Sequence, residues 1–215
     1  MSVQAPAFAP PAVPFAPPPL PAAAPAAPKF TVQQYFEIER QSEIRYEYVE
    51  GELIAMPGVT LPHNEITLNI ALGVKTAFQG RDCRVYAEAV RVRVSPTQYR
   101  YPDVVAICGE RVTDGENPPA LLNPGVIVEV LSSSTEAKDK GEKFAEYKRM
   151  ASLTDYVLAA QDEILVTHYV RQSPRQWTIT DYTELTDALT FAALGVTLTV
   201  ADIYSGIAFP APAAP

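Results

Sequence analysis

The chain has 215 residues, of which 47% are hydrophobic and 20% are charged, and its formal net charge is -8. This length and composition suit one soluble globular domain with a sizeable core. The negative charge argues against a passive nucleic-acid coat, because such proteins gain affinity from excess lysine and arginine. It leaves room for an enzyme that concentrates a few basic groups around an acidic, metal-loaded site.

The two ends of the chain differ from its middle. Residues 1–28 are almost entirely proline and alanine. Proline removes backbone donors and fixes extended geometry, which predicts a polyproline-like or disordered arm. Such an arm serves as a linker or as a ligand for a proline-reading groove. We expect one folded domain over residues 29–209 and a short Pro/Ala tail over residues 210–215.

The cysteines and the lack of long apolar runs in the sequence indicate the cellular compartment in which the protein is expected. No run of about 18 apolar residues predicts a membrane span, and the N-terminus lacks the pattern of a signal peptide. Cys83 and Cys108 are the only cysteines and have no zinc-type spacing. Two thiols fit a reducing cytoplasm, with a single disulfide as the alternative. We expect a cytoplasmic protein.

The first part of the domain predicts a helix, a hairpin and a second helix. Residues 31–41 form a short helix that Thr31 can cap, and residues 46–49 and 53–56 flank a hairpin turn. The second helix begins near Pro62 and ends at Gly80. Its apolar residues recur at helical spacing: Ile66, Leu68, Ile70, Leu72, Val74 and Phe78.

The second part predicts strands with one intervening helix. Strands are expected over residues 84–94, 104–107, 126–131, 156–159, 164–170 and 177–182. The helix, over about residues 136–150, follows a serine-rich turn. We therefore predict an α/β fold with a central mixed β-sheet.

Glu129 lies alone in the most apolar of these strands, over residues 126–131. Along a strand it shares one face with Ile127 and Leu131. Burying an unpaired carboxylate is costly, so it must be paired, bound to a metal or protonated. The sequence favours a polar active-site floor over a structural ion pair or a carboxylate at a strand end.

Asp103 is the second acid that we expect in the active site. It follows Pro102 and opens the apolar run Val104-Val105-Ala106-Ile107, which places it at the entrance of a strand. Because Glu129 lies in the next apolar strand, the two acids can hold a hard cation such as Mg²⁺ through oxygen ligands.

A lysine on the following helix can complete this arrangement. Lys140, Lys143 and Tyr147 are spaced by three and four residues, which predicts one shared helix face. Lys143 would then project a cation over the acids and stabilise developing phosphoryl charge. The alternative is a solvated helix, because acidic residues alternate with the lysines.

The order of these motifs closely resembles the Uma-two-type family of endonucleases, long catalogued as a domain of unknown function. The resemblance covers most of residues 30–205. It is carried by Tyr48-Val49-Glu50-Gly51-Glu52-Leu53, His63, Glu88, Tyr101-Pro102-Asp103-Val104-Val105, Val128-Glu129-Val130-Leu131-Ser132-Ser133-Ser134-Thr135, Asp139-Lys140-Gly141-Glu142-Lys143, Tyr147 and Asp155-Tyr156.

This resemblance implies the restriction-endonuclease-like fold of the PD-(D/E)XK superfamily, with two acids and a lysine in the site. Carried over, the acids are Asp103 and Glu129, which would bind Mg²⁺ or Mn²⁺. The usual motif has its lysine two residues after the second acid, where this chain has Leu131. The resemblance therefore implies a lysine displaced to Lys143.

Three further residues are expected to support the site. His63 would orient phosphate or water, with a satisfied polar residue as the alternative. Glu88 would be a third acid, with a structural ion pair to Arg91 or Arg100 as the alternative. Tyr147 would orient its neighbours, whereas His168 is interpreted as structural.

We accordingly expect a Mg²⁺-dependent endonuclease that hydrolyses DNA phosphodiester bonds. The alternative is an inactive nuclease-fold protein that only binds nucleic acid or a protein partner. We also expect a homodimer of residues 29–209, because nucleases of this fold often cut duplexes as symmetric pairs. Aromatic residues around Tyr46, Tyr48 and Trp177 suit such an interface, unless they belong to the core.

Overall fold

A computed structural model describes residues 29–132 and 136–209. The Pro/Ala arm over residues 1–28 and the tail over residues 210–215 lie outside the described residues. So does most of the serine-rich turn, at residues 133–135.

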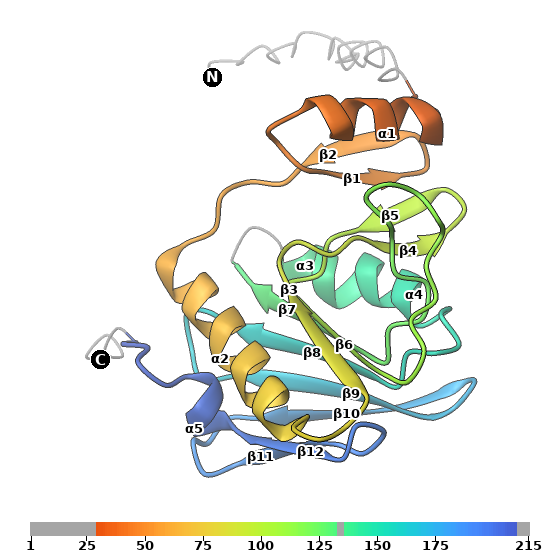
Figure 1. Ribbon diagram of the computed structural model, residues 1–215. Helices are drawn as coiled ribbons and strands as arrows, with labels where there is room; N and C mark the ends of the chain where they lie inside the picture. The colour runs from red at the N-terminus through yellow and green to blue at the C-terminus, as the bar shows by residue number, and fades with distance from the viewer. Residues whose placement is uncertain (1–28, 133–135, 210–215) are drawn as a thin grey trace, which may run out of the picture.

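The centre of the fold is a six-stranded mixed sheet with strand order β10-β9-β8-β7-β6-β3 (Figure 1). Its strands are β3 (Cys83–Ala87), β6 (Val104–Cys108), β7 (Val126–Leu131), β8 (Asp155–Ala160), β9 (Val166–Ser173) and β10 (Gln176–Tyr182). Only β7 and β8 run parallel in this sheet, and the chain crosses between them through a helical segment. The predicted α/β fold with a mixed sheet is confirmed.

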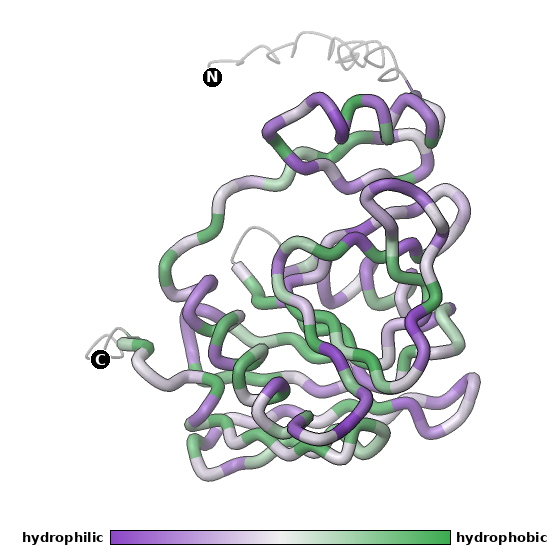
Figure 2. The backbone as a smooth tube through the Cα atoms, viewed as in Figure 1, coloured by the Kyte–Doolittle hydropathy of each residue, from purple (hydrophilic) through white to green (hydrophobic). Residues whose placement is uncertain are grey.

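One face of this sheet is covered by α2 (Leu61–Ala77) and α5 (Val200–Ile203), together with the hairpin of β11 (Ala188–Phe191) and β12 (Val196–Thr199). Ile66, Ile70 and Val74 of α2 pack there against Val128 of β7. The hydrophobic strands that run through this layer are visible in Figure 2. Leu68 and Leu72, by contrast, are exposed, because α2 buries only one side. Their grouping with the apolar residues of the predicted amphipathic helix is therefore wrong.

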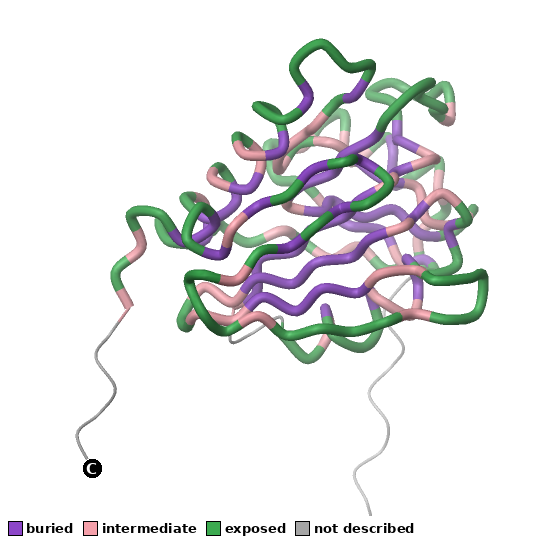
Figure 3. The backbone as a smooth tube through the Cα atoms, turned by 90° about the horizontal axis from the view of Figure 1, so that it is seen from below, coloured by how far each residue is buried: buried purple, intermediate pink, exposed green. Residues whose placement is uncertain are grey.

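The opposite face is covered by the helical segment between β7 and β8. This segment comprises α3 (Glu136–Lys138), a π-helical turn η1 (Asp139–Lys143) and α4 (Phe144–Tyr147). Tyr147 packs there with Ile127 and Leu131, which extend from the same face of β7 as Glu129. Figure 3 shows the central strands buried while the peripheral loops are exposed.

A second, four-stranded sheet has the order β2-β1-β5-β4 and lies with α1 (Val32–Gln41) at the top in Figure 1. Its strands are β1 (Tyr46–Val49), β2 (Glu52–Ala55), β4 (Val92–Ser95) and β5 (Gln98–Arg100). Thr31 caps α1 as predicted. Tyr48 is only 3% exposed and stacks on Tyr35. This aromatic residue therefore belongs to the core rather than to an exposed interface.

Trp177 is also engaged within the chain. Its ring packs edge-on against Phe144, and the Arg171 guanidinium lies 4.5 Å from its centre. Tyr48 and Trp177 therefore give little support to a dimer interface, and the homodimer stays a prediction.

The expected strand over residues 84–94 is wrong, because the chain changes sheets within it. β3 belongs to the central sheet and β4 to the four-stranded sheet. Glu88 lies between them with a φ of 56°, and its backbone N–H donates to the Asp103 carbonyl at 2.8 Å. A left-handed residue ends β3 and redirects the chain.

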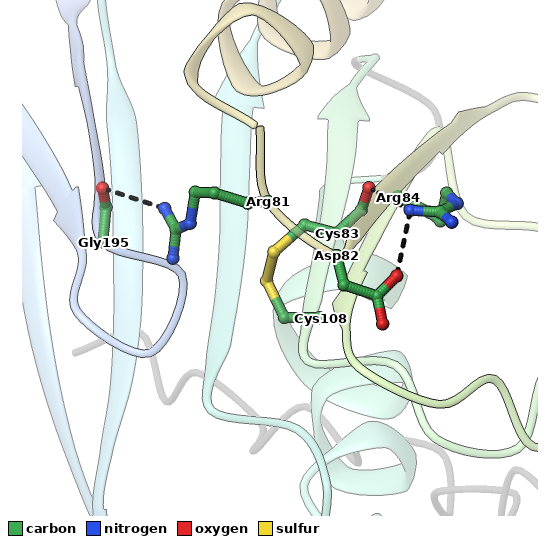
Figure 4. Close-up of a disulfide and its surroundings, with 6 residues drawn as sticks. All are labelled: Arg81, Asp82, Cys83, Arg84, Cys108 and Gly195. Atoms are coloured by element: carbon green, nitrogen blue, oxygen red, sulfur yellow. Dashed lines mark hydrogen bonds and ion pairs between the residues drawn. A yellow bond between two sulfur atoms is a disulfide. The ribbon is translucent and has the colours of Figure 1, made fainter. Parts of the chain in front are cut away.

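Cys83 and Cys108 form a disulfide between β3 and β6, where they are direct cross-strand partners (Figure 4). The interpretation as two free thiols is wrong, and its disulfide alternative is observed. Closing a loop with a sequence separation of 25 contributes about 3.5 kcal/mol by chain entropy. No helix of the described residues is long and apolar enough to cross a membrane. The cytoplasmic location stays a prediction.

Candidate functional site

A cavity of about 310 Å³ lies between the two sheets, beside the ends of β6 and β7 that carry the predicted acids. The linker between β2 and α2, at residues 56–60, lines its other side. The charged or titratable residues that line it are Glu47, His63, Tyr101, Asp103, Glu129, Lys138, Asp139 and Lys143. All three predicted catalytic residues therefore reach one cavity.

The pairing of β6 with β7 brings the two acids together. Val104 of β6 pairs with Val128 of β7 in an antiparallel register. Asp103 comes directly before Val104 and Glu129 directly after Val128, so the two acids lie side by side. Asp103 is held at this edge because its Oδ2 accepts a hydrogen bond from the Val130 amide at 2.6 Å. The predicted placement of two acids on adjacent strands is confirmed.

Glu129 is almost fully buried, with 3% of its surface exposed. Its Oε1 accepts a hydrogen bond from the Tyr147 hydroxyl at 3.0 Å, and its Oε2 lies 3.0 Å from Lys143 Nζ. Burial raises the pKa of Glu129 to about 8, with the charge of Lys143 acting against it and that of Asp103 adding to it. The site thus holds a carboxyl that can take up a proton near neutral pH.

Lys143 stays a cation because several carboxylates surround it. Its Nζ lies 2.9 Å from Asp139, 3.0 Å from Glu129 and 3.9 Å from Glu47. Burial alone would lower the pKa of Lys143, but these carboxylates outweigh it and hold the pKa above its usual value. The pKa values of both partners are therefore raised, that of Glu129 chiefly by burial and that of Lys143 by the carboxylates around it.

The π-helical turn is what aims Lys143 into the cavity. The Tyr156 hydroxyl donates to the Asp139 carbonyl at 2.9 Å, and the Phe144 ring stacks on Tyr156. Lys140 points elsewhere, because it is exposed and pairs with Glu136. The prediction that Lys140 shares a face with Lys143 and Tyr147 is wrong, since a π-helical turn shifts the angular spacing of a helix.

Two acids in the site were missed by the sequence analysis. Asp139 was named only within the motif that carries the family resemblance and was given no role in the site, but it is buried against Lys143. Glu47 lies in β1 and reaches across from the other sheet, with Oε2 2.7 Å from Arg100. Burial acts to raise the pKa of Glu47, but Lys143 and Arg100 outweigh it and lower the pKa.

Of the three predicted supporting residues, His63 and Tyr147 contact the site acids and Glu88 does not. His63, in the first turn of α2, has Nε2 3.1 Å from Asp103 Oδ1, and Tyr147 contacts Glu129 as described. Glu88 does not line the cavity, and it accepts a hydrogen bond from Asn64 instead of pairing with Arg91 or Arg100. His168 pairs with Asp155 at 2.7 Å in the core, as its structural interpretation predicted.

The donor set fits a hard divalent cation that keeps part of its hydration. Asp103 and Glu129 offer carboxylate oxygens, and each oxygen retains a lone pair beside its present contact. In residues 29–132 and 136–209, no group of three or more His, Cys, Asp or Glu side chains could enclose a metal by itself. Mg²⁺ commonly binds through one or two carboxylates, with water and substrate phosphate supplying the rest.

Comparison with solved structures shows the fold. A crystal structure described as "a putative nuclease belonging to DUF820" from Anabaena variabilis superposes with a TM-score of 0.63. The match covers 76% of this chain and 92% of that chain, at 19% sequence identity. The mixed α/β architecture is thus shared with a nuclease-like structure.

Comparison by sequence shows the family. The uncharacterized protein slr1290 of Synechocystis is 31% identical over 183 residues, which cover 85% of this chain and 95% of that protein. The uncharacterized protein sll1609 of the same organism is 31% identical over 152 residues, or 70% of this chain and 86% of that protein. The Uma2 family, described as "Putative restriction endonuclease", matches residues 32–201. The chain therefore belongs to the Uma2 family, as its motifs predicted.

Proposed function

We propose that this protein is a metal-dependent endonuclease that hydrolyses DNA phosphodiester bonds at the cavity around Glu129. The observation that carries this proposal is the convergence of Asp103, Glu129 and Lys143 on one cavity from three separate elements. Structural ion pairs need no cavity, whereas a site for substrate does. Membership in the Uma2 family supports the same reaction class.

Each residue has a role that follows from its position. Asp103 and Glu129 would hold Mg²⁺ or Mn²⁺, which activates water and offsets charge at a scissile phosphate when it is bound. Lys143 is a fixed cation 3.0 Å from Glu129 and would stabilise negative charge that develops on the phosphoryl oxygens. Tyr147 orients the Glu129 carboxylate through its hydroxyl, and His63 orients Asp103.

A cleavage assay tests this proposal. Purified protein should cut DNA when Mg²⁺ or Mn²⁺ is added and should stop when the metal is chelated. The substrates should include single-stranded and double-stranded DNA as well as RNA, each with several divalent metals. Absence of cleavage under every one of these conditions would refute the proposal.

One observation favours the alternative of a protein that only binds. Lys143 already contacts Glu129, and every carboxylate oxygen of the two acids has a contact within the chain. A metal must therefore share these oxygens rather than occupy a vacant set. A binding-only protein need not take up Mg²⁺ or Mn²⁺ at Asp103 and Glu129, so metal titration separates the two functions.

A further inference from the structure

The acids of the proposed nuclease site lie below the protein surface. The side chain of Glu129 is 4% exposed, that of Asp103 is 14% exposed and that of Lys143 is 11% exposed. A phosphate can therefore meet these groups only by entering the cavity. This constraint bears on the form of nucleic acid that the site can accept.

The size of the cavity sets an upper limit on what enters. Its volume of about 310 Å³ lies at the small end of the roughly 300–1,000 Å³ typical of small-molecule sites. That space suits one nucleotide and is too small for a base pair with both of its backbones.

The wall opposite the acids is apolar. It is formed by the linker between β2 and α2, where Met56, Pro57 and Val59 line the cavity next to Ile54 of β2. The linker is tied at both ends, because the Met56 amide donates to the Arg45 carbonyl at 2.9 Å and the Thr60 hydroxyl donates to Gln161 at 2.7 Å. Apolar side chains at a fixed distance from the acids can contact a base or a deoxyribose.

The charges around the cavity suit contact with one or two phosphates rather than with an extended backbone. Proteins that bind duplex DNA neutralise several phosphates with lysine and arginine along an extended surface. Among the described residues that line this cavity, Lys138 and Lys143 are the only basic ones apart from His63, and the chain carries a net charge of -8. A duplex is also stiff over the length of a binding site, so its backbone cannot bend into a small recess.

We propose that the cavity accepts one unpaired nucleotide, so that the enzyme acts on single-stranded DNA or on unpaired tails rather than on intact duplex. A single strand can turn its backbone and place a base against Met56 and Val59 while its phosphate reaches Lys143 and the cation that Asp103 and Glu129 would hold. This inference rests on the proposed nuclease function and deepens it by naming the substrate class.

Equilibrium binding to short labelled oligonucleotides tests the inference. One strand is presented alone, as a blunt duplex and as a duplex with an unpaired tail, with Ca²⁺ as the hard cation and with DNA integrity checked on a gel. Opening one base-pair step costs about a tenfold loss in affinity, so the single strand should bind at least about tenfold more tightly than the blunt duplex. The tailed duplex should bind like the single strand.

A matched pair of variants examines the apolar wall. Val59 is 51% exposed and lines the cavity, whereas Val112 is 44% exposed and lies outside its lining. Val59→Ser should weaken binding of the single strand by about fourfold, the value of roughly one buried methylene group. Val112→Ser should leave every affinity unchanged, because it removes the same side chain from a surface without ligand.

The outcomes separate this inference from the proposed function. Equal affinity for single strand and blunt duplex, equal effects of the two valine variants, or no binding to any DNA would overturn the inference. If the protein prefers the single strand but cuts nothing with Mg²⁺ or Mn²⁺, the substrate class stands and the nuclease proposal fails. If it cuts duplex as fast as single strand, the nuclease proposal stands and the substrate class fails.

Discussion

Glu129→Gln should reduce metal-dependent cleavage by about a thousandfold, because a bound metal contributes several kcal/mol to stabilising the transition state. Glutamine has nearly the same shape and removes one anionic oxygen donor. Its amide oxygen can accept from Lys143 while its NH2 group donates to the Tyr147 hydroxyl oxygen, so both neighbours keep a partner. Initial rates of wild type and variant at saturating Mn²⁺ measure the effect. Cleavage within tenfold of wild type would show that Glu129 does not hold the metal.

The same variant should also change how stability depends on pH. The pKa of Glu129 is raised from 4.5 to about 8 in the folded protein, chiefly by burial. A carboxyl whose pKa is higher in the folded protein than in the unfolded chain ionises more readily when the chain unfolds. It therefore lowers the stability of the fold at pH values above its unfolded pKa. Metal-free wild type should therefore lose stability between about pH 5 and pH 8, by an amount on the order of 3 kcal/mol. Glu129→Gln lacks this titration and should not show that loss.

Urea unfolding of both proteins in EDTA at pH 6 and pH 9 isolates the effect of Glu129. The difference between the two proteins should increase with pH in favour of the variant, because all other groups are common to both. Parallel pH dependences would mean that the Glu129 carboxyl is not desolvated as the structure implies.

Arg100→Met should destabilise the fold by about 3–5 kcal/mol, because it leaves buried carboxylates without their cation. Arg100 is fully buried, with Nη1 2.7 Å from Glu47 and with Nε and Nη2 donating to both Glu146 oxygens at 2.9 and 2.8 Å. It links the four-stranded sheet to the helical segment that carries Lys143. The free energy of unfolding in urea measures the loss.

Two control variants interpret this result. Arg84 forms an exposed pair with Asp82 at 3.2 Å, so Arg84→Met should cost less than about 1 kcal/mol. Arg100→Lys keeps the charge without the planar fork and should be intermediate. Equal losses for Arg84→Met and Arg100→Met would contradict the account of Arg100 as the centre of a buried network.

The sequence predicts Asp103 and Glu129 well because their signals are local. A carboxylate within a short β-branched run must be accommodated, and an acid directly before an apolar run falls at a strand entrance. The strand over residues 126–131 was predicted with its exact bounds. Lys143 was placed by its helical spacing from Tyr147 and by the family resemblance, and it reaches the cavity with the acids.

Glu47 and Asp139 could not be predicted in the same way, because their burial depends on partners far away in the sequence. Glu47 lies between two tyrosines in a hairpin strand, a pattern that is typical of a solvent-facing acid. Only the folded chain shows that Arg100 lies against it. The turn at Glu88 contains no glycine or proline from which it could have been predicted. The π-helical turn around Gly141 likewise has no periodic signal, since it adds one residue to an ordinary helix.

Metal binding tests the central claim most directly. Calorimetric titration of wild type with Mn²⁺ should show saturable uptake, and Asp103→Asn and Glu129→Gln should each weaken it at least about tenfold by removing one oxygen ligand. Glu142→Gln is the matched control, because Glu142 is exposed on the same helical segment and does not line the cavity. If wild type takes up no Mn²⁺, or if all three variants bind it as wild type does, then Asp103 and Glu129 do not form a metal site.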